Sequence, residues 1–404
     1  MDLNVEQQKA FDLVKKGKNV FITGSAGTGK SFIVKYITNY FKSIDNIYAL
    51  TALTGCAATL INAQTIHSYL CLGINNESAI KIYNNPKNKL QLKKIKEIFT
   101  IIIDEISMMN DELLTTINQL LMLIKNNDKP FGGIQIIFVG DFCQLPPIQG
   151  MYCFQGDTWN ELNLNTIILN QLMRQKDDDL FRTILEEIRY GKCCKETFKI
   201  LKELKNTTFN SDIKPTKLYP INKNVDIINT NEFNKLCILN NNETKTYKAT
   251  ASHAYIKTLE YDVKLTLNTQ VLVTRNIAVV DGLVNGTRGI VVKMELNHIV
   301  IKDINDKLHI IEYYKDINEN NKSWVSFLPI KLAYALSIHK AQGATLDAIE
   351  LDLGSDIFVC GQLYTALSRA KCLKSIKIIN INKDSFLTNN EVKKFYNTNI
   401  DNND

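Results

Sequence analysis

A glycine-rich segment near the N-terminus has the composition and spacing of a phosphate-binding loop. It lies between an apolar run at residues 20–22 and an expected helix at residues 32–41, and it fits the pattern G-x-x-x-x-G-K-S. Its residues are Gly24, Ser25, Ala26, Gly27, Thr28, Gly29, Lys30 and Ser31. Glycines allow a tight turn whose N–H groups face phosphate oxygens, while Lys30 would reach the β- and γ-phosphates and Ser31 would bind Mg²⁺. The segment predicts a site for ATP and Mg²⁺; the alternative is a chance glycine-rich turn.

Two further polar segments follow apolar runs. Asp104 and Glu105 come directly after the run at residues 101–103. Asp104 suits Mg²⁺ and Glu105 suits a general base for water, although such a pair can also be a solvated helix cap. Residues 139–147 lead from another run into a loop that two prolines stiffen, which would hold Gln144 near the γ-phosphate. On its own, the Q-L-P-P sequence indicates only a turn.

These groups need a scaffold, and the first third of the chain predicts one. Short apolar, mostly β-branched runs at residues 20–22, 47–50, 101–103 and 134–139 alternate with helical stretches. This alternation is typical of an α/β fold with a parallel sheet and helices on both faces. Ligands of such sheets bind at the carboxyl ends of the strands, where the polar segments lie.

Later strands predict a second α/β domain and a β insertion. Candidate strands of the second domain occupy residues 217–219, 270–274 and 375–379. Between residues 289 and 327 the pattern changes to hairpin-like alternation, with strands at 299–301 and 308–311 joined by a turn around Asn305 and Asp306.

Composition sets broader limits. A chain of 404 residues with 45% hydrophobic and 22% charged residues can bury two or three domain cores. The formal net charge of +6 suits a polyanionic partner, but many basic proteins have none. The nine cysteines are scattered without zinc-ligand spacing, so reduced thiols are expected. Without a run of about twenty apolar residues or a signal-like start, we expect a soluble intracellular protein with no membrane partner, in the cytoplasm, the nucleus or a viral replication site.

With these motifs the chain resembles a known family, the petite-integration-frequency (PIF) type DNA helicases of superfamily 1, B branch, which are RecD-like. The resemblance runs through nearly the whole chain. It is carried by the phosphate-binding loop and by residues 102–108, 130–147, 332–346 and 363–370. The later two segments read L-A-Y-A-L-S-I-H-K-A-Q-G-A-T-L and L-Y-T-A-L-S-R-A.

The resemblance implies two RecA-like P-loop domains with parallel sheets and a small SH3-like β insertion in the second. The expected boundaries are 1–170 for the first domain, with a wedge-like insertion at 73–98. The second domain would comprise 171–284 and 325–388, with the β insertion at 285–324 and a tail at 389–404.

It also implies roles at the nucleotide. Gln7 would read adenine through its amide, and Gln342 and Gly343 would lie near the nucleotide. Arg174 and Arg369 would reach the γ-phosphate, since a planar guanidinium can bind two phosphate oxygens and neutralise developing charge. The alternative for Arg369 is a surface ion pair.

DNA contacts follow from the same resemblance. In the first domain they would come from Thr51, Thr54, Thr65, His67 and Ser68, and in the second from Arg288, Ser337, His339 and Lys340. Hydroxyl and N–H groups there would hold phosphates without reading bases. His67 could instead be a buried structural histidine, and the turn at residues 285–289 could be only a turn. A basic cluster comprises Lys87, Lys89, Lys93, Lys94 and Lys96; it would contact DNA or be a solvated face.

The function that the resemblance implies is an ATP-dependent helicase that moves 5′ to 3′ on single-stranded DNA and unwinds duplex. Single-stranded and forked DNA would be its partners, and it would work as a monomeric motor with unknown protein partners. Replication, repair, recombination and telomere maintenance remain open as pathways. A translocase that does not separate strands, a non-enzymatic nucleic-acid binding module and an RNA-directed helicase remain alternatives.

Overall fold

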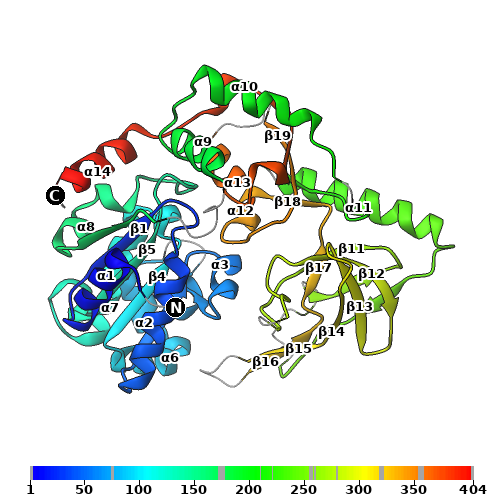
Figure 1. Cartoon of the computed structure of the whole chain (residues 1–404). Coiled ribbons are helices and arrows are strands. Elements are labelled where there is room, and N and C mark those ends of the chain that lie inside the picture. Colours follow the sequence, from blue (N-terminus) through cyan, green and yellow to red (C-terminus); the bar gives the residue numbers. More distant parts are fainter. Residues whose placement is uncertain are drawn as a thin grey trace. The chain divides into compact units, whose positions relative to one another are not determined.

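The computed structural model describes residues 3–73, 77–171, 178–209, 211–220, 222–253, 258, 261–278, 281–317, 323–353 and 359–401 (Figure 1). The chain forms two compact units. The first comprises Met1–Thr197, Ile357–Ser368 and Lys383–Asp404, and the second comprises Phe198–Asp356 and Arg369–Asn382. Among the described residues, no helix is both long and apolar enough to cross a membrane.

The first unit contains a six-stranded sheet in which every pairing is parallel. The strand order is β3-β2-β4-β5-β1-β6. Their bounds are β1 Val20–Gly24, β2 Tyr48–Ala52, β3 Gln64–Thr65, β4 Thr100–Asp104, β5 Gln135–Gly140 and β6 Asn165–Leu169. The four strands predicted in this region are confirmed. Residues of β4 are buried on both faces, which explains the continuous apolar run at its centre, residues 101–103.

Helices of the first unit complete the α/β layers. They are α1 Val5–Lys15, α2 Lys30–Ser43, α3 Gly55–Leu60, α4 Ile66–Tyr69, α5 Ala79–Asn84, α6 Lys89–Glu97, α7 Asp111–Lys125, α8 Asp157–Glu161, α9 Asp179–Arg189, α13 Gln362–Leu367 and α14 Asn390–Asp401. Short 3₁₀ turns are η1 Pro86–Asn88, η2 Ile106–Met108, η3 Pro130–Gly133, η4 Cys153–Gln155 and η8 Lys383–Ser385. One core cluster joins α1 and α2 to β1, β5 and β6 through Phe11, Ile22, Ile33, Val139 and Ile167.

The second unit contains a four-stranded parallel sheet of order β18-β7-β19-β20. Its strands are β7 Thr216–Tyr219, β18 Ala335–Ser337, β19 Ile349–Leu353 and β20 Ile376–Ile381, and its helices include α11 Asn222–Leu239 and α12 Ile338–Ala341. Helix α10 Lys195–Glu203 spans the boundary between the units, followed by η5 Leu204–Asn206, and η7 Leu373–Ser375 precedes β20. Two parallel α/β sheets therefore confirm the predicted fold class.

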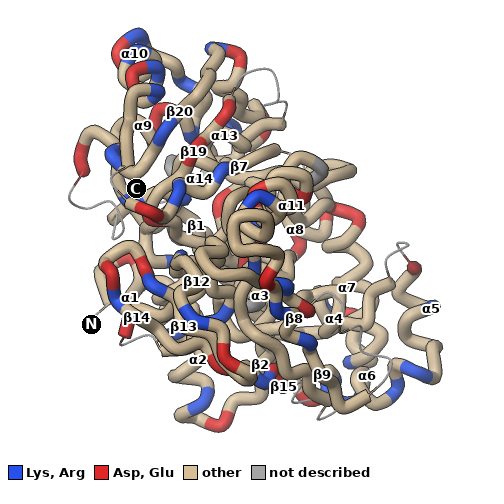
Figure 2. The backbone as a smooth tube through the Cα atoms, turned by 90° about the vertical axis from the view of Figure 1, so that its right-hand side faces the viewer, with Lys and Arg blue, Asp and Glu red and all other residues tan. Residues whose placement is uncertain are grey.

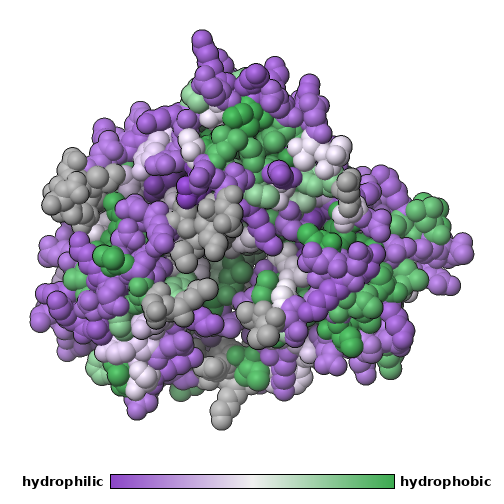
Figure 3. Space-filling view, viewed as in Figure 1, coloured by the Kyte–Doolittle hydropathy of each residue, from purple (hydrophilic) through white to green (hydrophobic). Residues whose placement is uncertain are grey.

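The β region of the second unit runs from β8 to β17 and forms three antiparallel sheets, with orders β14-β13-β12-β11-β17, β15-β16-β9 and β10-β8. Its strands are β8 Lys245–Tyr247, β9 Thr250–Ala251, β10 Val263–Leu265, β11 Gln270–Val273, β12 Arg288–Met294, β13 His298–Asp303, β14 Leu308–Glu312, β15 Tyr314–Ile317, β16 Trp324–Phe327 and β17 Ile330–Leu332. The predicted hairpin is confirmed, because β13 pairs with β14. Strand β14 lies at the sheet edge with Leu308 61% exposed, where Figure 3 shows hydrophobic surface over this sheet.

Three expected boundaries require correction. The strand at residues 270–274 was assigned to the second parallel sheet, but β11 pairs antiparallel with β12 and β17. A short apolar run does not distinguish a parallel core strand from a buried antiparallel one. The β region is consequently longer than 285–324. Residues 389–404 were expected as a tail, yet α14 belongs to the first unit and buries Val392 and Tyr396. Residues 171–197, 357–368 and 383–388 were expected in the second domain but belong to the first unit.

Candidate nucleotide site and DNA-contacting residues

The phosphate-binding loop has the predicted context, because it leaves β1 and enters α2. Gly24, Gly27 and Gly29 all adopt positive φ, and Gly29 is the N-cap of α2. At Gly24 a Cβ atom would lie 2.5 Å from the Leu169 carbonyl oxygen and 2.8 Å from the Thr28 hydroxyl. Only glycine allows this close approach between the loop and β6.

Lys30 folds back onto the loop that precedes it. Its Nζ donates to the carbonyl oxygens of Gly24 (2.7 Å) and Ser25 (3.0 Å). Burial lowers the pKa of Lys30, and the carboxylates of Asp141, Glu105 and Asp104 act in the opposite direction. The lysine and the acidic groups at neighbouring strand ends therefore share one electrostatic environment.

The acidic pair lies at the end of β4. Asp104 is buried, and its Oδ1 accepts a hydrogen bond from the Glu105 amide (2.8 Å). Burial and then the charge of Glu105 raise the pKa of Asp104 to about 7. Glu105 has φ +55, a left-handed conformation that non-glycine residues adopt at a cost of about 1–3 kcal/mol. Its side chain is half-buried, so water can reach it.

Gln144 lies in the loop after β5 and is buried. The backbone N–H of Gln144 donates to the Asp141 carbonyl oxygen (2.9 Å). Gly361, which precedes α13, packs against this loop: a Cβ atom there would overlap the Gln144 carbonyl oxygen and lie 2.6 Å from that of Cys143. The start of α13 thus fixes the backbone on which Gln144 is mounted.

A buried polar network beside the loop was not predicted. Asp141, at 0% exposure, pairs with Arg189 through Nε–Oδ2 (3.1 Å) and Nη2–Oδ1 (3.0 Å). The Tyr364 hydroxyl donates to Asp141 Oδ2 (3.2 Å) and the Tyr396 hydroxyl to Oδ1 (3.0 Å). Burial alone would raise the pKa of Asp141, but Arg189 and Lys30 outweigh it and hold the pKa below its usual value. The carboxylate is therefore ionised and accepts all of these bonds.

A pattern in the sequence could have revealed two members of this network. Arg189 lies four residues after Leu185 on the buried face of α9, and Tyr396 lies four residues after Val392 on α14. A charged residue on an apolar helical face needs a buried partner. What the sequence alone lacks is the identity of that partner.

A cavity of about 590 Å³ opens beside the network in the first unit. Ser25, Ala26, Arg189, Tyr364 and Tyr396 line it together with Glu6, Lys9, Arg182, Glu186 and Tyr190, among others. It therefore adjoins the phosphate-binding loop.

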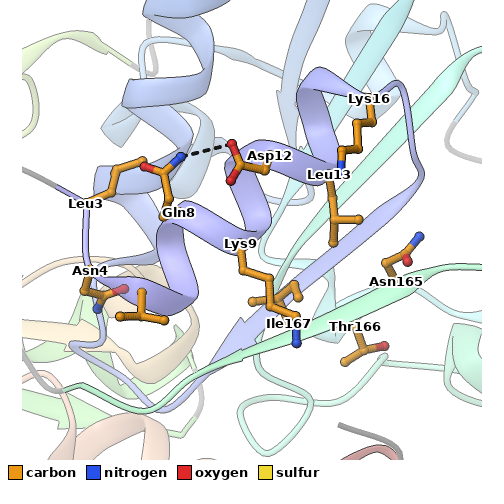
Figure 4. A pocket seen from close by; sticks show the side chains of 11 residues that line it. Leu3, Asn4, Gln8, Lys9, Asp12, Leu13, Lys16, Asn165, Thr166 and Ile167 are labelled. Atoms are coloured by element: carbon orange, nitrogen blue, oxygen red, sulfur yellow. Dashed lines mark hydrogen bonds between the residues drawn. The ribbon is translucent and has the colours of Figure 1, made fainter.

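A second cavity, of about 840 Å³, lies beside α1 and β6 (Figure 4). Its lining includes Gln8 and Asp12, which hydrogen-bond to each other (3.0 Å), and none of its lining residues belongs to the phosphate-binding loop. Gln7, predicted to read adenine, is buried in the capping box of α1, where its Oε1 accepts from the Asn4 amide (3.1 Å).

The DNA candidates of the first unit divide into buried and accessible side chains. Thr51 is fully buried and donates to the Ile102 carbonyl oxygen (2.8 Å), so its side chain serves the sheet, and its DNA contact stays a prediction. Thr54 and Thr65 are half-buried and accept backbone amides at 3.2 Å, Thr65 as the N-cap of α4. His67 is half-buried, with a pKa lowered by burial, and Ser68 is exposed.

The candidates of the second unit divide in the same way. Ser337 is buried and its hydroxyl accepts the Lys340 amide (3.3 Å) as the N-cap of α12, so its phosphate contact stays a prediction. His339 is half-buried, with a pKa lowered by burial, whereas Lys340 is exposed. Gln342 is buried and Gly343 adopts φ +80.

Arg288, also predicted to touch DNA, makes contacts within the protein. It is buried and pairs with Asp347 through Nε–Oδ1 (2.5 Å) and Nη2–Oδ2 (2.8 Å). Its Nη1 donates to the Lys214 carbonyl oxygen (2.6 Å). These bonds favour a structural role, because a basic residue in a turn motif can serve a buried carboxylate as readily as a phosphate; the DNA contact stays a prediction.

Two arginines, Arg174 and Arg369, were predicted to reach the γ-phosphate. Arg369 belongs to the second unit and is buried, with Nη1 3.4 Å from the Ala344 carbonyl oxygen. Arg174 lies outside the described residues.

The basic cluster lies on η1 and α6, and Figure 2 shows lysine positions of α6 in blue. Lys87, Lys89, Lys93 and Lys96 are exposed and Lys94 is half-buried. The apolar face of α6 is anchored by Leu92 and Ile95. The four exposed lysines are available to a polyanion.

Comparisons with known proteins identify the family. The family described as PIF1-like helicase matches residues 2–199. The ATP-dependent DNA helicase PIF1 of Xenopus laevis is 34% identical over 98% of this chain, which covers 64% of that protein's length. The ATP-dependent DNA helicase Pif1 of Bdellovibrio bacteriovorus is 32% identical, and 98% of this chain covers 92% of it.

Solved structures agree. The crystal structure of Pif1 helicase from Candida albicans has a TM-score of 0.82 at 28% identity, covering 98% of this chain and 99% of that one. The structure of Bacteroides sp Pif1 in complex with ADP-AlF4 has a TM-score of 0.82 at 26% identity, covering 98% and 97%. The resemblance inferred from the motifs is confirmed: this chain belongs to the PIF1-like helicase family.

Proposed function

We propose that this protein is an ATP-dependent DNA helicase that translocates 5′ to 3′ on single-stranded DNA and unwinds duplex. The observation that carries the proposal is the juxtaposition of Lys30, in a phosphate-binding loop, with the carboxylates at the ends of β4 and β5. A related Bacteroides Pif1 has been crystallised with ADP-AlF3 and single-stranded DNA, and another structure concerns forked duplex unwinding by Pif1 helicases. Family membership and the nucleotide-site chemistry therefore favour the same activity.

The nucleotide would bind in the loop of residues 24–31, with Lys30 balancing charge on the β- and γ-phosphates. The hydroxyl of Ser31 and the carboxylate of Asp104 are oxygen donors of the kind that Mg²⁺ takes in nucleotide sites, where phosphates and water supply its other ligands. When bound, Mg²⁺ neutralises phosphate charge. Its proximity would also favour the ionised form of Asp104 over the neutral form that burial promotes.

Hydrolysis needs a base, an orienting group and positive charge at the γ-phosphate. Half-buried Glu105 is the proposed base for water, and Gln144 would orient the γ-phosphate. We assign the positive charge to Arg174 and Arg369, a contribution worth roughly 10³–10⁵ in rate where such arginines have been removed. Gln7, Gln342 and Gly343 are proposed to contact the nucleotide.

Two similar one-turn helices are the proposed DNA grips. Helix α4 and helix α12 each follow a strand, each is capped by a hydroxyl, and each carries a half-buried histidine at its second position. The exposed side chains are Ser68 on α4 and Lys340 on α12. These, with Thr54, Thr65 and the two histidines, would hold backbone phosphates on a single strand.

Single-stranded and forked DNA are the proposed partners, for a monomeric motor acting in replication, repair, recombination or telomere maintenance. We propose that the exposed lysines of α6 lie at the duplex junction as a wedge. Because phosphate contacts discriminate poorly between DNA and RNA, the preference for DNA is part of what must be tested.

Unwinding of a fluorescent forked DNA with either a 5′ or a 3′ single-stranded tail tests the proposal, using the wild type and Lys30→Ala with ATP and Mg²⁺. We expect unwinding only with the 5′ tail and none in the variant. DNA-stimulated hydrolysis without unwinding would indicate a translocase. Neither activity, with DNA binding retained, would indicate a binding module.

A further inference from the structure

We propose that Tyr364 is a positioning residue of the nucleotide site, whose hydroxyl holds the Ala26 amide and thereby keeps the phosphate-binding loop in its binding shape. The inference deepens the proposed ATP-dependent function and rests on it. It concerns contacts within the first unit only, since Tyr364, Ala26 and their partners all belong to that unit.

The Tyr364 hydroxyl joins the loop to Asp141. It accepts a hydrogen bond from the Ala26 amide (2.8 Å) and donates to Asp141 Oδ2 (3.2 Å). A phenol has one proton to donate, and an ionised carboxylate can only accept. The proton therefore points to Asp141 and a lone pair points to Ala26, so the hydroxyl has one favourable orientation.

Both bonds are shielded from water. Tyr364 is 1% exposed and Ala26 is 5% exposed. A buried amide that loses its acceptor pays the full cost of desolvation, which is larger than the net value of a solvent-exposed hydrogen bond. The Ala26 amide is thus directed toward the tyrosine, and this direction sets the backbone path of the loop between Ser25 and Gly27.

Asp141 is itself held firmly. Arg189 binds both of its oxygens, and the Tyr396 hydroxyl, which donates to Oδ1, also lies 2.7 Å from the Thr23 hydroxyl. Thr23 precedes the loop, and Ala26 is its third residue. The two tyrosines therefore tie the beginning of the loop at two points to one carboxylate at the end of β5.

Helix α13 connects this anchor to the loop that carries Gln144. The helix starts after Gly361, which packs against the Gln144 carbonyl oxygen, and Tyr364 is its third residue. All six side chains of α13 are buried. A displacement of α13 would therefore move the Gln144 backbone and release Ala26 together, which makes Tyr364 the link between the two parts of the nucleotide site.

The substitution Tyr364→Phe removes only the hydroxyl. Binding of a fluorescent ADP analogue with Mg²⁺ and no DNA, together with steady-state ATP hydrolysis, measures the effect. We expect Kd and KM to rise roughly tenfold, as for the loss of one buried acceptor, while kcat changes by less than about twofold. This split between KM and kcat distinguishes positioning from a general loss of folded protein, which would lower kcat and leave KM unchanged.

Tyr247→Phe is the matched control. The Tyr247 hydroxyl is buried in the β region of the second unit and donates to the Glu295 carbonyl oxygen (2.8 Å). The control should lose a similar amount of thermal stability with no change in nucleotide affinity. If Tyr364→Phe does not fold, Tyr396→Phe leaves Ala26 its acceptor but takes one donor from Asp141, and a rise in Kd of about threefold is expected.

Each result has one meaning. If the wild type binds no nucleotide, the proposed function fails before the positioning role is addressed. If the wild type binds nucleotide and neither tyrosine variant of the first unit differs from Tyr247→Phe, the positioning role is overturned. Tighter binding by Tyr364→Phe would also overturn it, because the hydroxyl would then be competing with a phosphate for the Ala26 amide.

Discussion

Each unit of this protein buries an arginine–aspartate pair with two contacts between the side chains, and the two pairs serve different purposes. Arg189 and Asp141 lie beside the phosphate-binding loop of the first unit. Arg288 and Asp347 lie in the second, where the guanidinium also binds the Lys214 carbonyl oxygen (2.6 Å) just before β7. Two tyrosines donate to the carboxylate of the first pair and contact the phosphate-binding loop or the residue before it. The second pair joins β12 of the β region to the parallel sheet.

The comparison shows that a buried charge does not by itself identify a ligand site. The two pairs are distinguished by the hydrogen bonds that their charged groups make beyond the pair itself. Asp141 accepts hydroxyl donors from two other segments, α13 and α14, and the backbone amide of Cys143 in its own loop, whereas Arg288 uses its spare donors on the backbone of its own unit. The sequence motif around Arg288 suggested DNA, and only its partners revealed a structural role.

The largest expected effect separates the pairs by stability and by nucleotide binding. Arg189→Met and Arg288→Met each leave a carboxylate without its partner, which costs about 3–5 kcal/mol. The cost should be at the lower end for Arg288→Met, because Asp347 keeps 13% side-chain exposure while Asp141 has none. Thermal unfolding measures the stability, and titration with an ADP analogue measures affinity. Only Arg189→Met should weaken nucleotide binding; equal weakening by both would erase the distinction.

The next effect tests whether the loop of Gln144 depends on α13. Gly361→Ala and Gly282→Ala impose the same left-handed strain, at φ +76 and +79, worth about 1 kcal/mol. A Cβ at Gly282 meets nothing within 4 Å, whereas one at Gly361 displaces the Gln144 carbonyl. DNA-stimulated ATP hydrolysis should fall on the order of 10²-fold in Gly361→Ala only, as expected when a catalytic group shifts by about 1 Å. Similar hydrolysis rates for both variants would show that the position of Gln144 does not depend on α13.

A smaller effect concerns DNA and the second pair. Lys340→Met removes an exposed cation from the proposed grip, so the slope of log affinity against log salt for single-stranded DNA should become shallower by about 0.7. Arg288→Met, measured at a temperature where it stays folded, should keep the wild-type slope. Fluorescence anisotropy of a labelled oligonucleotide gives both slopes. A shallower slope in Arg288→Met would instead support a DNA contact by Arg288.

The smallest effect involves the half-buried histidines of the two grips, which unlike the buried pairs should carry no charge at neutral pH. Burial lowers the pKa of both His67 and His339 below the usual 6.5. Because the folded state binds fewer protons than the unfolded state between that lowered pKa and 6.5, stability should fall as pH drops through this window. DNA affinity should change by less than about twofold from pH 7 to 8.5. A steep loss over that range, absent in His67→Gln, would show a charged histidine on the DNA.

Much of the nucleotide site could be predicted from sequence because its chemistry fixes residue types within short segments. Residues 24–31 bend as glycine spacing requires, and Asp104 ends β4 as its apolar run implies. The sequence was insufficient where long-range packing decides which side chains are buried. Thr51 looked accessible in a T-A-L-T-G segment, but sheet pairing turned its hydroxyl toward Ile102.

The buried network shows the same limit more strongly. Arg189 is 48 residues from Asp141, Tyr364 is 223 residues away and Tyr396 is 255. Nothing in local spacing connects these positions. Likewise, the apolar run of β11 was consistent with either kind of sheet until its neighbours were known.

The position of Tyr396 has a consequence for how the protein is made. Its hydroxyl closes a contact with Thr23 across 373 residues of chain. At translation rates of about 5–20 residues per second, the strand that leads into the phosphate-binding loop is synthesised tens of seconds before its last buried partner leaves the ribosome. The nascent chain can pair its early strands during that interval, but the first unit acquires its complete interior only once α14 has been synthesised. Until then the chain would expose Phe21, Phe142, Phe154 and Trp159, the aromatic side chains on which Phe395 of α14 packs, and this surface is where a chaperone could act.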